Sequence, residues 1–231
     1  MRPSRGEQAL KSIVTVAAIV LLALAGCSSP ALKKTQGLEV ADKLEPVPKG
    51  TSVYQYIDPA YDLSGFRRLM VDPVVVYQGA DNGFGDIPQA DREALARFIE
   101  SKAPEILGGG KIALTRAPAP DVLRLRFTLV GMTRSRPVLQ GVSYVIPIGA
   151  ALNIAKGASG GSGTFMGSVT LAGEFYDSTT GALVAGFLAS RSPNALNVSA
   201  IAGESAAAEQ GAILLLEELR KRFDARAAKW K

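Results

Sequence analysis

Residues 122–130, VLRLRFTLV, alternate between apolar and polar side chains through most of their length. The polar positions Arg124, Arg126 and Thr128 fall on one side of this alternation. The apolar positions fall on the other: Leu123, Leu125, Phe127 and Leu129. Because successive side chains of a β-strand point to opposite faces, the pattern predicts a strand with one buried and one solvated face. The chain must therefore build a sheet that is covered on one side.

Three further stretches are typical of strands. Residues 66–79 are rich in β-branched side chains, and Pro73 interrupts their hydrogen-bonding ladder, which favours an edge position or a bulge. Residues 111–117 predict a short strand. Residues 167–191 predict a hairpin whose turn runs from Asp177 to Gly181.

Two stretches predict helices. Over residues 91–107, apolar side chains recur at helical spacing, and Glu93 precedes Arg97 by four positions. A second helix begins near Ser199, and its basic end suits the helix dipole. Its apolar stripe comprises Leu215, Leu219 and Phe223.

This order of elements predicts an α+β fold, with a mainly antiparallel sheet of about five strands and two helices packed on one face. We expect an export signal over residues 1–26, a flexible tether over residues 27–52 and a single domain over residues 53–231. An apolar and Gly-rich insert occupies residues 137–164 of that domain. A flexible tether of this length has a typical end-to-end distance of about 25–30 Å.

The first 26 residues are typical of an export signal. A basic start precedes an apolar run from Ile13 to Ala25, which is shorter than the roughly 20 residues that a membrane-spanning helix needs. The run ends in Leu24-Ala25-Gly26-Cys27, which resembles the bacterial lipoprotein lipobox. This resemblance implies cleavage before Cys27 and a covalent lipid on its sulfur. Because Ser28 rather than Asp follows, it also implies an outer-membrane anchor with the domain facing the periplasm. The alternative is an ordinary cleaved signal in which the cysteine falls by chance.

The net charge and the cysteine content limit the classes of binding partner and cross-link that we expect. The full chain has a net charge of +5, but removal of the signal takes away three cations and one acid. The mature chain then carries 23 Lys and Arg against 20 Asp and Glu, which gives little support to nucleic-acid binding. Cys27 is the single cysteine, and a chain of this length needs neither a disulfide nor a structural metal to fold.

The residue types also limit the chemistry. The chain has no histidine, which excludes Ser-His-Asp and Cys-His nucleophilic systems and histidine metal sites. Residues 81–86, DNGFGD, lack EF-hand spacing and are interpreted as a turn. Residues 156–167 lack the Lys-Ser/Thr of a phosphate loop and are interpreted as a loop. Asp72 and Asp177 are more typical of turns and strand ends than of an acid–base pair. We therefore expect a protein with no catalytic residues, no metal and no cofactor apart from the covalent lipid.

Four arginines of even parity form a candidate anion-binding surface: Arg124, Arg126, Arg134 and Arg136. In an unbroken strand they would line one face over about 40 Å. A row of guanidinium groups suits the phosphates and carboxylates of lipopolysaccharide, phospholipids or peptidoglycan. The alternative is a solvated face that is partly neutralised by Glu174. A break of the strand at Gly131 would separate Arg134 and Arg136 from the face that carries Arg124 and Arg126.

Residues 137–155, PVLQGVSYVIPIGAALNIA, form a second candidate surface. The stretch is apolar but too interrupted for a membrane-spanning helix. If it faces outward, it contacts another subunit, an envelope partner or the membrane. The residues that would make this contact are Val142, Val145, Ile146, Ile148 and Leu152. The alternative is a crossover that packs onto its own domain.

Residues 56–76, YIDPAYDLSGFRRLMVDPVVV, and residues 174–185, EFYDSTTGALVA, together with Arg191, carry a family resemblance. They resemble the bacterial lipoproteins of domain-of-unknown-function family 3313, and DLSGFRRLMVDPV is the most specific motif. The resemblance covers most of the mature chain. It implies a lipid-anchored envelope protein and supplies no catalytic residues.

These observations predict an outer-membrane lipoprotein that acts by binding, as an accessory or structural component of the cell envelope. The alternative is a subunit of an oligomeric secretion or transport complex, and a carboxylate-based hydrolase is less expected. The expected partners are the membrane, through the lipid anchor, and an envelope protein or a second copy of the chain. Nucleic acid is not among them.

The lipobox gives the first testable prediction. Cys27→Ser removes the sulfur that accepts the lipid, so the precursor should stay unprocessed by the lipoprotein signal peptidase and unlabelled by an alkyne palmitate probe in cells. Normal labelling of this variant would contradict the lipoprotein interpretation.

Overall fold

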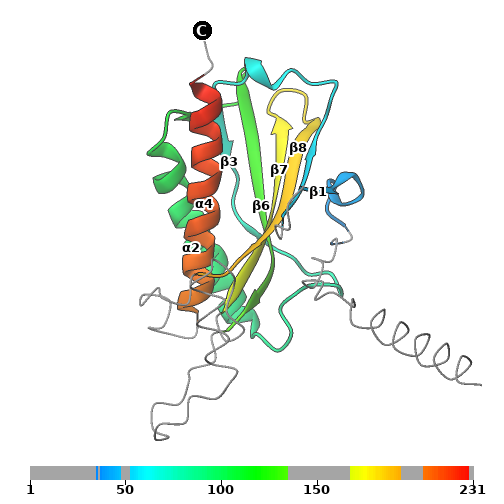
Figure 1. Ribbon diagram of the computed structural model, residues 1–231, viewed down its shortest axis with the longest axis vertical. Helices are drawn as coiled ribbons and strands as arrows, with labels where there is room; N and C mark the ends of the chain where they lie inside the picture. The colour runs from blue at the N-terminus through cyan, green and yellow to red at the C-terminus, as the bar shows by residue number, and fades with distance from the viewer. Residues whose placement is uncertain (1–34, 36, 48–52, 135–166, 194–204, 229–231) are drawn as a thin grey trace, which may run out of the picture. The chain divides into compact units, whose positions relative to one another are not determined.

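A computed structural model of the chain describes residues 35, 37–47, 53–134, 167–193 and 205–228 (Figure 1). Its centre is one sheet of eight strands, flanked on one face by two helices. The strands are β1 (Glu45–Pro46), β2 (Val53–Ile57), β3 (Arg68–Val71), β4 (Val75–Val76), β5 (Ala113–Leu114), β6 (Val122–Thr133), β7 (Ser168–Asp177) and β8 (Leu183–Arg191). The helices are α2 (Gln89–Gly108) and α4 (Ala206–Ala227). Two short 3-10 turns are η1 (Ala41–Lys43) and η2 (Leu63–Gly65).

The sheet is mixed, with strand order β1-β2-β8-β7-β6-β3-β5 and with β4 paired to β6. Neighbours along β1-β2-β8-β7-β6 are antiparallel, whereas β3 pairs in parallel with β5 and β6, and β4 pairs in parallel with β6. The α+β class is confirmed, but the prediction of about five mainly antiparallel strands is wrong. The parallel pairs arise because α2 carries the chain from β3 and β4 back to the start of β5 and β6, as parallel pairing requires.

Several expected elements are confirmed with revised bounds. The stretch around Pro73 is interrupted, and β3 and β4 lie on either side of that residue. The hairpin forms as β7 and β8, and Gly181 adopts the positive φ of +73° that its turn requires. The strands that were missed are β1 and β2. Two-residue strands such as β1 are too short to show a period, and Tyr54, Gln55 and Tyr56 in β2 blur the apolar alternation.

The odd-numbered apolar residues of β6 face the helices, as the alternation predicted. Leu123, Leu125 and Phe127 pack in one cluster with residues of both helices, including Leu107 and Leu216. The small residues at the start of α4 let this helix approach the sheet closely. A Cβ added at Gly211 would lie 2.7 Å from the carbonyl oxygen of Arg191, so only glycine fits there.

A β-bulge in β6 reverses the facing of its last residues. The register with β7 shifts between Leu129 and Gly131. Val130 stays on the face away from the helices with the other even-numbered residues, whereas Met132, also even-numbered, packs on the helix face. The backbone of Gly83 lies against Gly131, where an added Cβ would be 2.8 Å from the Gly83 carbonyl oxygen. This contact explains why a glycine stands at the bulge.

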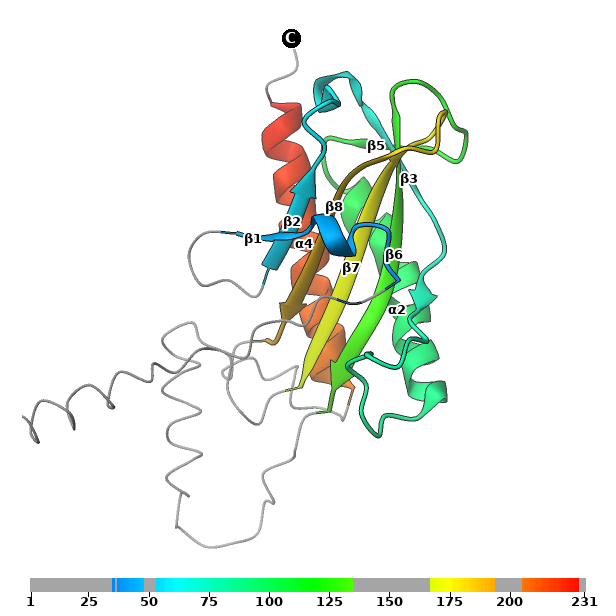
Figure 2. The same ribbon diagram turned by 90° about the vertical axis from the view of Figure 1, so that its right-hand side faces the viewer.

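The segment before β2 covers part of the other face of the sheet (Figure 2). Val40 and Leu44 are 0% and 1% exposed and pack against Ala172 of β7 and Leu188 of β8. The backbone N–H of Val40 donates to the buried Glu174 carboxylate at 3.1 Å. The prediction of a free tether over residues 27–52 is therefore wrong for residues 37–47, which belong to the folded domain.

Neither helix among the described residues is long and apolar enough to cross a membrane. Cys27, the export signal and the insert over residues 137–164 lie outside the described residues.

The buried position of Leu44 gives the second prediction. Leu44→Ala should lower the free energy of unfolding by about 2–5 kcal/mol, because it removes a buried leucine side chain and leaves a cavity. Glu45→Ala, the next residue and an exposed one, is the matched control and should change it little. Denaturant unfolding followed by circular dichroism measures both. Equal midpoints for the two variants would mean that the segment does not stabilise the domain.

Candidate functional site

A groove opens on the helix face of the sheet, between β2, β8 and the second half of α4 (these elements are seen in Figure 2). Its cavity volume is about 210 Å³. Most of its lining is apolar, and the large apolar side chains that line it are Tyr56, Ile57, Leu63, Phe66, Ile112, Leu123, Phe175, Phe187, Leu215, Leu219 and Phe223. Five charged or amide side chains also line it: Gln55, Arg191, Glu218, Arg222 and Arg226.

The groove exists because α4 does not extend across the sheet to β2. In β2, Val53, Gln55 and Ile57 lie opposite Ala189, Phe187 and Ala185 of β8 and face the helix side with them. Packing on α4 involves β7 and β8, whereas no comparable contact joins α4 to β2. Ile57 is consequently 55% exposed, the highest value among the large apolar residues of the described chain. An exposed apolar strand residue beside a cavity is a feature of binding surfaces.

Three phenylalanines form the floor of the groove. The ring of Phe175 lies 6.2 Å from that of Phe187 and 6.0 Å from that of Phe223, the latter pair edge to face. These distances are favourable for aromatic pairs. Phe187 and Phe223 are only partly buried. The floor is therefore a pre-formed aromatic surface that remains accessible from the groove.

The rim of the groove is cationic. Glu218 accepts hydrogen bonds from two arginines, at 2.6 Å from Arg191 Nη2 and at 2.9 Å from Arg222 Nη2. Arg226 makes no ion pair among the described residues; the pKa of Asp62 is lowered chiefly by hydrogen bonds from Ser64, and the charge of Arg226 adds a smaller contribution. The rim thus holds three guanidinium groups against one carboxylate.

Glu218 links strand β8 to helix α4 across the rim. Burial raises the pKa of its carboxyl group, and the hydrogen bonds from Arg191 and Arg222 together outweigh this effect, so the pKa lies below its usual value. The carboxylate is therefore kept ionised at neutral pH. Both of its oxygens are already engaged by the two arginines.

The arginine row expected from parity is divided by the bulge. Arg124 and Arg126 share the face away from the helices, but Arg134 lies on the helix face, where its Nη2 is 2.6 Å from Oδ2 of Asp91 in α2. Arg136 lies outside the described residues. The row of four required an unbroken strand, and the extra residue at positions 130–131 removes Arg134 from it, as the alternative of a break at Gly131 anticipated.

Arg124 and Arg126 are held by neighbouring side chains. Arg124 Nε donates to both oxygens of Asp72, at 3.0 and 2.8 Å, and Arg126 Nε lies 3.9 Å from the same carboxylate. The guanidinium group of Arg126 also stacks 5.0 Å from the ring centre of Tyr176. Asp72, rather than the predicted Glu174, neutralises this surface. The interpretation of Asp72 as a strand-end polar group agrees with this pairing.

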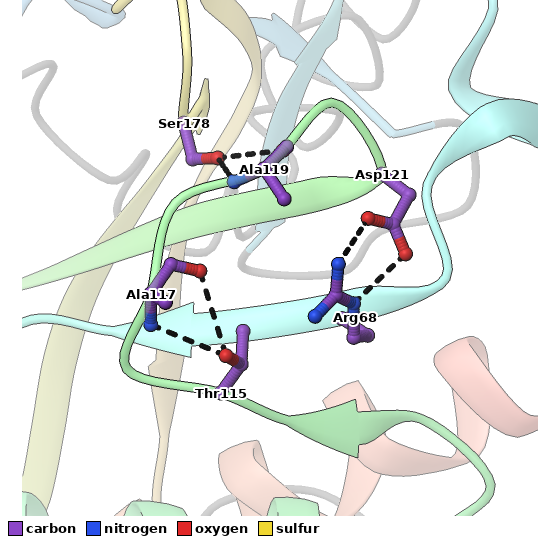
Figure 3. Close-up of polar contacts among 6 residues, drawn as sticks. All are labelled: Arg68, Thr115, Ala117, Ala119, Asp121 and Ser178. Atoms are coloured by element: carbon purple, nitrogen blue, oxygen red, sulfur yellow. Dashed lines mark hydrogen bonds and ion pairs between the residues drawn. The ribbon is translucent and has the colours of Figure 1, made fainter.

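A third polar cluster secures the loop between β5 and β6 (Figure 3). Arg68 donates two hydrogen bonds to Asp121, at 2.8 and 2.5 Å, and the pKa of Asp121 is lowered chiefly by this contact. The hydroxyl of Ser178 bridges the backbone of Ala119. Within the loop, the hydroxyl of Thr115 bonds in the same way to the backbone N–H and carbonyl of Ala117. Ser178 and Thr115 thus fix backbone, and Arg68 and Asp121 neutralise each other, so all four side chains have structural roles.

The acidic turn and the hairpin turn have the local contacts of turns. The hydroxyl of Tyr77 donates to Asp81 at 2.7 Å, and the side chain of Asn82 bonds to the backbone of Gly79 and Phe84. Asp177 accepts from the backbone of Thr179 and Thr180. Among the described residues no cluster of three or more acidic or cysteine side chains is suitable for a metal ion.

Sequence reasoning missed the groove. The stripe of Leu215, Leu219 and Phe223 on α4 was expected, and Leu215 and Leu219 are indeed buried, but the stripe was not expected to line a groove as well. The basic residues after it were interpreted as complements of the helix dipole. The signal that was available is the four-residue spacing of Glu218, Arg222 and Arg226, which places a charged edge beside the apolar stripe. The five candidate contact residues of the insert, and Cys27, lie outside the described residues.

Glu218 gives a pH prediction. A carboxyl group whose pKa is lower in the folded state stabilises the fold above its unfolded pKa, and this contribution is lost as the pH falls through the folded pKa. Glu218→Gln should therefore lower the free energy of unfolding by about 1 kcal/mol at pH 7, and the difference from the wild type should shrink below about pH 4. Glu217→Gln, on the adjacent residue, is the control. A pH-independent difference would show that packing, and not charge, explains the effect.

Comparison with solved structures gives distant likenesses. The PelC dodecamer from Paraburkholderia phytofirmans shares 18% identity, with 73% of this chain and 96% of that chain covered and a TM-score of 0.38. Protein XCC0632 from Xanthomonas campestris, of family DUF330, shares 14% identity, with 75% and 92% covered and a TM-score of 0.36. These likenesses assign no function to this chain. No curated protein matches it.

The family model described as "Protein of unknown function (DUF3313)" matches residues 33–219. This span includes nearly all of the described domain, from the N-terminal segment to Leu219 in α4. It also includes both stretches on which the resemblance was based. The chain belongs to the DUF3313 family.

Proposed function

We propose that this protein is a lipid-anchored accessory protein of the bacterial cell envelope, and that it acts by binding an apolar ligand in the groove between β2, β8 and α4. The observation that carries the proposal is the aromatic floor beside the exposed Ile57, which the described residues leave uncovered. The lipobox around Cys27 supports the location, because a lipid on that residue would tether the domain at a membrane surface.

The charged groups of the groove favour binding over catalysis. General acid–base chemistry needs a carboxyl group that is free to exchange a proton with the substrate. Glu218 is the one carboxylate among the described lining residues, and two arginines hold it ionised. An apolar cavity with a few fixed polar groups at its edge is the usual form of a ligand site.

The proposal is tested with a neutral photoreactive probe. The processed, full-length protein is purified in amphipol and exposed to a long-chain alcohol that carries a diazirine, and the labelled peptides are mapped by mass spectrometry. We expect labels on β2 and on the second half of α4. Ile57→Asp should reduce this labelling several-fold, because a carboxylate beside the floor makes the groove unfavourable for an alkyl chain.

The matched control is Val75→Asp. Val75 is also an exposed β-branched strand residue, 48% exposed, but it lies in β4, outside the groove lining. This variant should be labelled like the wild type. Labelling that is spread over the surface, or equally reduced in both variants, would contradict a binding function for the groove. Thermal melting of both variants confirms that each remains folded.

A further inference from the structure

We propose that the occupant of the groove is a long-chain carboxylate, a fatty acid, with its alkyl chain along the aromatic floor and its head group at Arg222 and Arg226. This inference rests on the proposed binding function of the groove. It adds the chemical class of the ligand and the direction in which the ligand lies.

The length of the groove matches one acyl chain. Its α4 side runs from Leu215 to Arg226, which at 1.5 Å per residue is about 16 Å. The hydrocarbon core of a bilayer is about 30 Å thick and contains two leaflets, so one extended acyl chain is about 15 Å long. The floor along this path is apolar, with Leu219 and Phe223 on the helix side and Phe187 on the sheet side. An alkyl chain along this path would thus lie against apolar atoms of the floor, with the polar groups at its edge.

The charge of the rim selects an anionic head group. Glu218 is shared between Arg191 and Arg222, so one carboxylate serves two cations. Arg226 has no ion pair among the described residues. Arg222 and Arg226 are four residues apart and therefore lie on the same side of the helix. Two guanidinium groups in this arrangement are suited to a carboxylate, which accepts charge-assisted hydrogen bonds from both.

The position of the third cation fixes the direction of the ligand. Arg191 is 24% exposed at its side chain and is occupied by Glu218 and by the backbone carbonyl of Ser190. Arg222 is 53% exposed and uses one nitrogen for Glu218, which leaves further donors for a ligand. The excess positive charge is thus concentrated at the Arg222–Arg226 end, and the alkyl tail points toward Leu215 and Val53.

Other occupants fit these features less well. The apolar insert of this chain, residues 137–155, contains no Asp or Glu and so offers no anion to the rim. A neutral lipid would leave Arg226 without an ion pair among the described residues and Arg191 and Arg222 with one carboxylate between them.

The test compares two photoreactive probes of equal length, a sixteen-carbon fatty acid and the corresponding alcohol, on the processed full-length protein in amphipol. We expect the acid to label the groove peptides more strongly than the alcohol at neutral pH. The double variant Arg222→Gln, Arg226→Gln should reduce labelling by the acid about tenfold and leave labelling by the alcohol unchanged, because only the charged hydrogen bonds are lost. Arg226→Gln alone should give a smaller reduction. It breaks no ion pair among the described residues and so serves as the variant without a folding cost.

Lys221→Gln, an exposed cation on the same helix but outside the groove lining, is the control and should change neither signal.

Competition identifies the source of the carboxylate. Unlabelled hexadecanoate should displace the acid probe at much lower concentration than octanoate, because the shorter chain buries less apolar surface. Stronger displacement by lysophosphatidylglycerol than by hexadecanoate would overturn the fatty-acid assignment in favour of a phospholipid. Equal labelling by acid and alcohol in the groove would overturn the anionic preference and leave the proposed binding function intact. Absence of groove labelling by either probe would overturn both. Cross-linked dimers that hexadecanoate prevents from forming would assign the groove to a second copy of the chain.

Discussion

The structure depends on a mismatch between the width of its sheet and the width of its two helices. Seven strands lie side by side, and at about 4.8 Å per strand spacing they span about 29 Å. Two helices packed about 8–10 Å apart, each with a diameter of about 10 Å, cover about 20 Å of this width. Part of the helix face must therefore stay open. Because α2 and α4 pack against each other over the middle of the sheet, the uncovered part lies at β2, and this places the groove there.

The opposite face of the sheet also has apolar surface that must be covered. No helix of the length of α2 covers it in the described chain. Instead, the short segment around Val40 and Leu44 covers its apolar half, and paired charges occupy the other half. Burial of Glu174 beneath this segment is tolerated because the backbone N–H of Val40 donates to its carboxylate. The N-terminal segment is thus a part of the fold, and its position explains why the sheet does not expose the apolar surface of Ala172 and Leu188.

Local patterns predicted the elements whose environment is set by their own sequence. The alternation in residues 123–129 and the helical spacing in residues 91–107 gave the correct elements, because each has one continuous buried side. The sequence indicated Gly131 as the point where the strand would break, but not that it does, since the reversal depends on the backbone of Gly83 lying against it, 48 positions earlier in the chain. The groove was missed for a related reason. Whether Phe223 is core or surface depends on the strand beside it, and β2 carries no clear alternation.

The arginines of this protein show how structure separates supporting charges from those that are available to a ligand. Arg68, Arg124 and Arg134 each have a carboxylate within 2.8 Å. Arg126 stacks on Tyr176 and lies near Asp72, the carboxylate that pairs with Arg124. At the groove the balance is different, because Arg191 and Arg222 share Glu218 and Arg226 has only the distant Asp62. Uncompensated charge and exposed apolar surface both lower stability, and each is uncommon in isolation. Their coincidence at one place, beside Ile57 and Phe223, is the pattern expected of a site kept for binding rather than for stability.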